Sequence, residues 1–258
     1  MNSRSSSSRP GRNSSSTRSS RSVSVIERSA GKPSKRWQPK QGKTARTIAT
    51  PQNMVESVLS PSERETLLRR QALLAAQEGQ FTEAIALFTQ LLNLNPQSAR
   101  DYNNRGLVYF QHGQMEQAIA DYNLALALNP TLDSAYNNRA NYYASQKMFL
   151  EAILDYDMAL DLNPTNIRAW INQGITCREL EMWDRAIESF DCALALNRLV
   201  SHVYAERGRT YHLCGDWNCA IADYHRALAS LAVPSATIAG HAARLRLQIE
   251  NWMAELLG

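Results

Sequence analysis

The sequence predicts an all-α solenoid built from helix pairs, preceded by a basic arm and closed by a C-terminal helix. Three observations lead to this prediction. The chain repeats itself every 34 residues, and lysine and arginine are concentrated in its first 60 residues. Within each repeat, apolar residues follow the three- and four-residue spacing of helices in two runs. A period of this length indicates stacked units that bury their apolar faces against one another.

The period is plainest in two recurring segments. A Leu-x-Leu-Asn segment ends at Asn95, Asn129, Asn163 and Asn197, and proline follows the first three of these asparagines. An earlier segment recurs at Tyr102–Gly106, Tyr136–Ala140, Trp170–Gly174 and Tyr204–Gly208. Together these matches predict a repeat domain over residues 60–232, with five units at about 65–98, 99–132, 133–166, 167–200 and 201–234.

Three positions of the unit keep a constant chemical character. The eighth residue is always small, the twentieth is always alanine and the twenty-fourth is always aromatic. Small residues let two helices approach closely, and the ring fills the space between them. In order, these positions hold Ala72, Gly106, Ala140, Gly174 and Gly208; Ala84, Ala118, Ala152, Ala186 and Ala220; and Phe88, Tyr122, Tyr156, Phe190 and Tyr224.

This pattern resembles the tetratricopeptide repeat over residues 61 to about 232. The resemblance implies an antiparallel helix pair per unit and a right-handed superhelix whose concave face is formed by the first helices. Some positions depart from the family pattern. The first unit has Leu68 in place of the early aromatic residue, the fourth has Cys177 where tyrosine is usual, and Arg198 replaces the proline after Asn197.

Both ends of the repeat array carry helix signals. Ser60, Pro61 and Glu63 form a capping box with proline at the first helical position, which predicts that a helix begins there. Residues 235–258 carry apolar side chains at three- and four-residue steps, which predicts an amphipathic capping helix for the last unit. The alternative is a self-association or partner helix, since this helix is longer than a cap requires and carries Trp252.

Charge divides the chain near residue 60. Residues 1–60 hold 12 of the 28 Lys and Arg and 2 of the 24 Asp and Glu, so they carry +10; the remainder, with 16 basic and 22 acidic residues, carries −6. Residues 1–59 have few apolar residues and 14 serines before residue 35, so we predict that this arm is disordered.

The basic arm has two interpretations. It could hold a polyanion, either nucleic acid or an anionic membrane surface, by charge alone. The alternative is a solvated tether or an organelle transit peptide. The polyanion interpretation assigns the contact to Arg18, Arg21, Lys35, Arg36, Lys40 and Lys43.

The remaining sequence gives little sign of catalysis or of a membrane span. No stretch approaches the roughly 18 apolar residues of a membrane helix, and we expect a cytoplasmic protein, or an organellar one if the arm is a transit peptide. His212, Cys214, Cys219 and His225 lie close in sequence, but their spacing is not that of a zinc site. We therefore expect free cysteines, no metal, no cofactor and no enzyme activity.

The resemblance assigns ligand contacts to the first helix of each unit. Six of the residues at the groove positions are asparagines, whose amides both donate and accept hydrogen bonds and suit an extended peptide backbone. Arginine exceeds glutamate at these positions, so we expect an acidic segment as the ligand. The alternative is that these asparagines are merely tolerated. The predicted groove residues are Arg100, Asn103, Asn104, Asn137, Asn138, Asn141, Arg168, Asn172, Arg178 and Arg209.

The groove does not reproduce the carboxylate clamp that some family members use to hold chaperone tails. The best frame places His202 and Glu206 where two cations are needed. The sequence therefore predicts a non-catalytic adaptor or assembly scaffold that binds a peptide segment. The alternative is an RNA- or polyanion-associated protein that uses its basic arm while the repeats recruit a protein partner.

Overall fold

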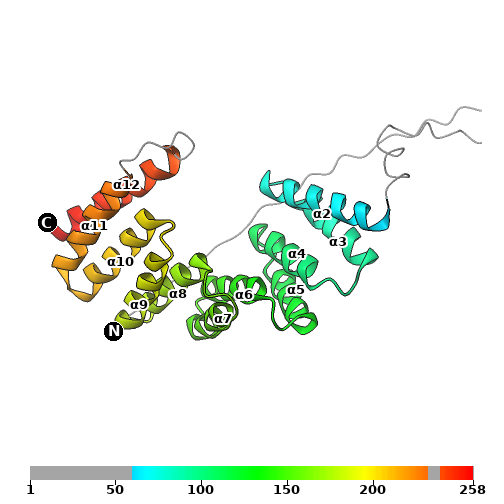
Figure 1. Ribbon diagram of the computed structural model, residues 1–258, viewed down its shortest axis with the longest axis horizontal. Coiled ribbons are helices and arrows are strands. Elements are labelled where there is room, and N and C mark those ends of the chain that lie inside the picture. The colour runs from blue at the N-terminus through cyan, green and yellow to red at the C-terminus, as the bar shows by residue number, and fades with distance from the viewer. Residues whose placement is uncertain (1–59, 232–238, 258) are drawn as a thin grey trace, which may run out of the picture. The chain divides into compact units, whose positions relative to one another are not determined.

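The computed structural model describes residues 60–231 and 239–257, and all regular structure in these ranges is helical (Figure 1). The all-α prediction is confirmed; the basic arm lies outside the described residues. The helices are α2 Pro61–Gln77, α3 Phe81–Leu94, α4 Ala99–Gln111, α5 Met115–Leu128, α6 Asp133–Ser145, α7 Phe149–Leu162, α8 Ile167–Glu179, α9 Trp183–Ala195, α10 Val200–Cys214, α11 Trp217–Leu231 and α12 Ala239–Leu257.

The ten helices from α2 to α11 form five consecutive pairs (Figure 1). Each first helix packs most extensively against the second helix of its own pair, and each second helix also packs against the next first helix. In addition, α4, α6, α8 and α10 contact one another in series. Helix α2 joins this series through Arg69, which donates to Asp101 of α4 at 2.7 Å. The first helices α2, α4, α6, α8 and α10 therefore share one face of the stack, which we call the first-helix face.

The predicted capping box at the start of α2 is confirmed. The backbone N–H of Glu63 donates to Oγ of Ser60 at 3.3 Å, and the backbone N–H of Ser60 donates to Oε2 of Glu63 at 2.8 Å. These bonds satisfy two donors that the first helical turn leaves without intrahelical partners.

The repeated small, alanine and aromatic positions form the core. All five alanines at the twentieth position are fully buried, and the aromatic side chains at the twenty-fourth are at most 1% exposed. A Cβ atom added to Gly174 would lie 2.7 Å from Cζ of Phe190. The small residue is therefore what allows α8 and α9 to close on the ring.

The turn inside each unit uses the left-handed backbone conformation. Glycine occupies this position in three units, as at Gly79 with φ +77°. In the third and fourth units the same position holds Lys147 and Glu181, with φ 59° and 57°. Because a Cβ atom crowds the backbone in this region, the two middle units carry conformational strain that the others avoid.

The junction between the fourth and fifth units differs from the others. Helix α9 ends at Ala195, and both Asn197 and Leu199 take left-handed conformations before α10 begins. The N-cap residue of α10 is Leu199, which supplies no side-chain hydrogen bond. The altered turn lies where Arg198 replaces the proline of the earlier units.

Helix α12 covers the end of the last unit. Leu245 and Ile249 are buried in one cluster with Ala220 and Tyr224 of α11. The ring of Trp252 stacks on that of Tyr224, with centroids 6.1 Å apart. The predicted capping helix is confirmed over 239–257, and residues 235–238 lie outside the described residues.

Candidate functional site

A ladder of polar side chains joins consecutive units. In the second unit, Arg105 donates through two nitrogens to both carboxylate oxygens of Asp121 at 2.8 Å, and through a third to Thr89 at 3.1 Å. The hydrogen bonds that the Arg105 guanidinium donates to Asp121 raise the pKa of Arg105 above its usual value. Each later rung links the seventh residue of a unit to its own unit and to the preceding one: Arg139 to Asp155 and Asn123, Gln173 to Ser189 and Asp157, Arg207 to Asp223 and Asp191.

The ladder belongs to the architecture of the stack. Its three arginines and the aspartates of their own units, Asp121, Asp155 and Asp223, are largely buried and satisfy one another in bidentate pairs. Side chains paired in this way are not free to bind a ligand. The predicted groove residues are therefore better candidates for a binding site than the ladder.

The predicted groove asparagines also bond to one another across unit boundaries. Nδ2 of Asn138 donates to Oδ1 of Asn103 at 2.9 Å, and Nδ2 of Asn172 donates to Oδ1 of Asn141 at 2.8 Å. Oδ1 of Asn141 additionally accepts from the hydroxyl of Tyr156 at 2.7 Å. These amides join first helices of neighbouring units. Each donating amide has a second N–H group with which it can donate another hydrogen bond.

Two of the four predicted groove arginines already pair with carboxylates of this chain. Nη1 of Arg178 donates to Oε2 of Glu206 at 2.9 Å, and both side chains are about nine-tenths buried. Nη1 of Arg209 donates to Oε2 of Glu255 on α12 at 2.6 Å, and its guanidinium lies over the ring of Trp252. We call these two pairs the closed end of the first-helix face.

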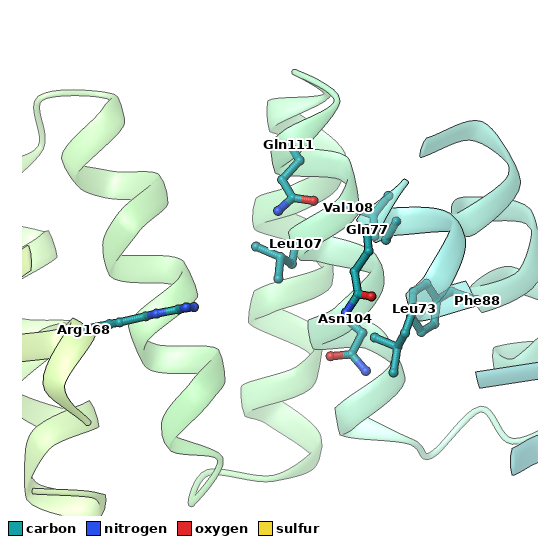
Figure 2. Close-up of a pocket in the computed structure, with 9 residues that line it drawn as sticks. Leu73, Gln77, Phe88, Asn104, Leu107, Val108, Gln111 and Arg168 are labelled. Carbon is teal, nitrogen blue, oxygen red and sulfur yellow. The ribbon is translucent and has the colours of Figure 1, made fainter. Parts of the chain in front are cut away.

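The other two predicted arginines lie elsewhere on the face. Arg100 and Arg168 are exposed, and neither has an ion-pair partner among the described residues. Arg168 extends from α8 toward a pocket of about 320 Å³ that is formed chiefly by α2 and α4 (Figure 2). We call this pocket, together with Arg168, the open end of the first-helix face.

The pocket combines an apolar lining with polar groups. Apolar side chains from α2, α3 and α4 line it together with three amides and Arg168 (Figure 2). Asn104 and Arg168, two of the ten groove residues predicted from the sequence, are among its lining residues, and so is Leu107, which the resemblance also places in the groove. The apolar members are Leu73, Ala76, Phe88, Leu107 and Val108, and the amides are Gln77, Asn104 and Gln111.

The residues of α2 that line the pocket were not among those predicted from the sequence. Leu73, Ala76 and Gln77 occupy the ninth, twelfth and thirteenth positions of the first unit. The family resemblance places groove residues at these three positions, as at Asn141 and Arg178 in later units. Applying those positions to the first unit as well would have identified all three.

The remaining predicted features lie apart from the pocket. Cys177 is buried, and burial raises the pKa of its thiol to about 11, so the thiolate is scarce at neutral pH. Within 60–231 and 239–257, no three His, Cys, Asp or Glu side chains group as metal ligands, and no helix is long and apolar enough to cross a membrane. Arg18, Arg21, Lys35, Arg36, Lys40 and Lys43 lie outside the described residues.

The stacked helix pairs and their unit-to-unit ladder define an α-solenoid of helix-turn-helix repeats. Comparison with family profiles identifies these repeats: one profile described as tetratricopeptide repeat matches residues 70–141, and a second with the same description matches residues 134–166. Residues 70–166 of the chain are therefore tetratricopeptide repeats, as the sequence predicted. No curated protein matches it in sequence.

Solved structures share the fold. A crystal structure of MamA protein aligns with a TM-score of 0.57 at 20% identity, covering 67% of this chain and 98% of that one. A structure of MamA 41-end from Desulfovibrio magneticus RS-1 also has a TM-score of 0.57, at 16% identity, covering 64% and 93%. At these identities the likeness shows a common solenoid architecture.

Proposed function

We propose that this protein is a non-catalytic adaptor or assembly scaffold that binds an acidic protein segment at the open end of its first-helix face. The tetratricopeptide repeats support a protein-interaction role. The observation that carries the finer proposal is Arg168, an exposed cation that faces an apolar pocket and has no carboxylate partner among the described residues.

The pocket offers three kinds of contact to one ligand. Its apolar lining, with Leu73 and Leu107, would bury an apolar side chain, at about 25 cal/mol for each Å² removed from water. The amides of Gln77 and Asn104 would hydrogen-bond the ligand backbone. Arg168 would bind a carboxylate in the bidentate geometry that a guanidinium provides. A short segment with an apolar residue close to acidic groups fits all three.

The closed end is not part of this assignment. Arg178 and Arg209 already pair with Glu206 and Glu255, so a ligand would have to displace a carboxylate of the protein itself. The acidic ligand predicted from sequence therefore has its best cation at Arg168.

The proposal is tested by fluorescence anisotropy with the full chain and a labelled synthetic peptide that carries leucine next to glutamates and a free C-terminus. We expect Arg168→Ala to weaken binding at least about tenfold. The matched control is Arg198→Ala, which removes an exposed arginine outside the pocket.

A second peptide tests the acidic preference. It replaces glutamates with glutamines and ends in an amide, and we expect it to bind the full chain at least about tenfold more weakly. Equal binding of the acidic peptide to the full chain and to Arg168→Ala would refute the site, and equal binding of the two peptides would refute the acidic preference.

A further inference from the structure

The second helix of the third unit carries exposed apolar side chains. Leu150 and Leu154 are each 66% exposed, Met158 is 42% exposed and Leu162 is 38% exposed. They follow one another at four-residue steps along α7, so they lie on one helix face and span about 18 Å. We call these four residues the α7 ridge.

The fold does not need this ridge. The opposite side of α7 supplies the repeat core through Ala152, Tyr156 and Ala159, which are buried as in the other units. The first two ridge residues occupy the eighteenth and twenty-second positions of the unit, and only the third of the five units has leucine at both. The other units hold Thr82 and Ala86, Glu116 and Ala120, Asp184 and Glu188, and Asn218 and Ala222.

The surroundings of the ridge are acidic. Glu151 and Asp161 are exposed and project from the same side of α7 as the ridge by helical spacing. Asp157, also on that side, is held by Arg185 at 2.6 Å, and Lys147 precedes the helix. The neighbouring second helices add exposed carboxylates, namely Glu116 on α5 and Asp184 and Glu188 on α9.

This charge pattern selects among possible occupants. An antiparallel second copy of α7, centred on the ridge, would place Glu151 opposite Asp161 and bring like charges together. An anionic membrane surface would be repelled in the same way. A partner with basic residues beside its apolar ones would gain from both the apolar contact and the charge.

We propose that the α7 ridge docks an amphipathic helix of a partner protein, with apolar side chains at three- and four-residue spacing flanked by lysine or arginine. Such a helix lays its apolar face along the ridge and places its cations beside Glu151 and Asp161. The ridge lies on a second helix, whereas the open end is formed chiefly by first helices. The two sites take ligands of opposite charge.

The probe is a labelled synthetic helix of about 18 residues with leucines along one face and lysines elsewhere. The double variant Leu150→Glu/Leu154→Ala gives α7 the residues that α5 carries at the same positions, Glu116 and Ala120. We expect the full chain to bind the probe in fluorescence anisotropy and the double variant to bind at least about tenfold more weakly. The variant adds a negative charge, which by itself would attract the lysines of the probe. A loss of binding therefore reports the lost apolar contact.

Three comparisons complete the test. A peptide with glutamates in place of the lysines should bind at least about tenfold more weakly, and Arg168→Ala should leave probe binding unchanged. The exchange Glu116→Leu/Ala120→Leu on α5 should add a second binding site. The circular dichroism spectrum of each variant should match that of the original chain.

Two results would overturn the proposal. One is equal probe binding by the original chain and the Leu150→Glu/Leu154→Ala variant. The other is a concentration-dependent dimer in sedimentation velocity that this variant dissociates, because the occupant of the ridge would then be a second copy of the chain.

Discussion

The arginines at the two ends of the first-helix face differ in whether they pair with a carboxylate of the same chain. At the closed end, Arg178 and Arg209 pair with Glu206 and Glu255 of the same chain. At the open end, Arg168 faces a pocket without such a partner among the described residues. Groove arginines that look equivalent in sequence therefore divide into two that stabilise the stack and two, Arg100 and Arg168, that remain unpaired among the described residues; of the latter, Arg168 lines the pocket.

The difference shows how a repeat protein can localise binding on a uniform scaffold. The ion pairs of the closed end join α8 to α10 and α10 to α12, so substitutions there should change the stability of the fold. The open end contributes exposed charge and a pocket, so substitutions there should act on binding. Three stability measurements sharpen this comparison.

The largest effect is expected at the closed end. Arg178→Ala leaves the buried Glu206 carboxylate without its partner, and we expect a loss of about 3 kcal/mol in the free energy of unfolding. Arg168→Ala should change it by less than about 0.5 kcal/mol. Guanidinium unfolding of the full chain, followed by circular dichroism, measures both. Replacing Glu206 by glutamine in the Arg178→Ala variant should recover part of the loss; equal effects of Arg178→Ala and Arg168→Ala would contradict the comparison.

A smaller effect is expected where the first unit meets the second, beside the open end. Burial raises the pKa of Asp101, but hydrogen bonds from Arg69 at 2.7 Å and from Ser98 outweigh it, so the pKa is lowered. The stabilisation is therefore complete above the unfolded-state pKa of about 3.9 and is lost as pH falls through the lower folded-state value.

This pH dependence is measured by comparing the original chain with Asp101→Asn. We expect the variant to be less stable by about 1.5 kcal/mol near pH 6, and the difference to shrink progressively below about pH 4. Urea unfolding at a series of pH values gives both quantities. A difference that stays constant down to about pH 2 would show that the ionised carboxylate is not what stabilises this junction.

The smallest effect is expected at the turn inside the fourth unit, between α8 and α9. Glu181 takes a left-handed conformation at the position where three other units have glycine, so Glu181→Gly should raise the free energy of unfolding by up to about 1 kcal/mol. The reverse change, Gly113→Glu, should lower it by a similar amount. Thermal unfolding of both variants tests the expectation, and destabilisation by Glu181→Gly would contradict it.

Much of the fold could be predicted because the same residue types recur at the same positions of each unit. Helical spacing, the buried alanines and the small residue that contacts the aromatic ring all recur at fixed positions, and the structure uses each in the same way. The capping box at Ser60 needed only four consecutive residues. These features depend on contacts within one unit, so one sequence containing five copies was sufficient.

The candidate site was harder to predict because it depends on contacts between units. Arg178 and Glu206 are 28 residues apart, and Arg209 and Glu255 are 46 apart. Neither spacing belongs to the repeat period, so residue type alone could not separate these arginines from Arg168. The α7 ridge could have been found by comparing the units at their eighteenth and twenty-second positions, where leucine stands out.

The polar ladder also bears on how such an array could have grown. Its rungs always run 16 residues forward within a unit and 16 residues back into the preceding one, as at Arg105 and Arg139. A duplicated segment of 34 residues would therefore contain a seventh-position residue and its partner within the unit. The second partner would be supplied by the preceding unit. Gene duplication could lengthen the protein in whole units without leaving a buried charge unpaired at the new junction between units.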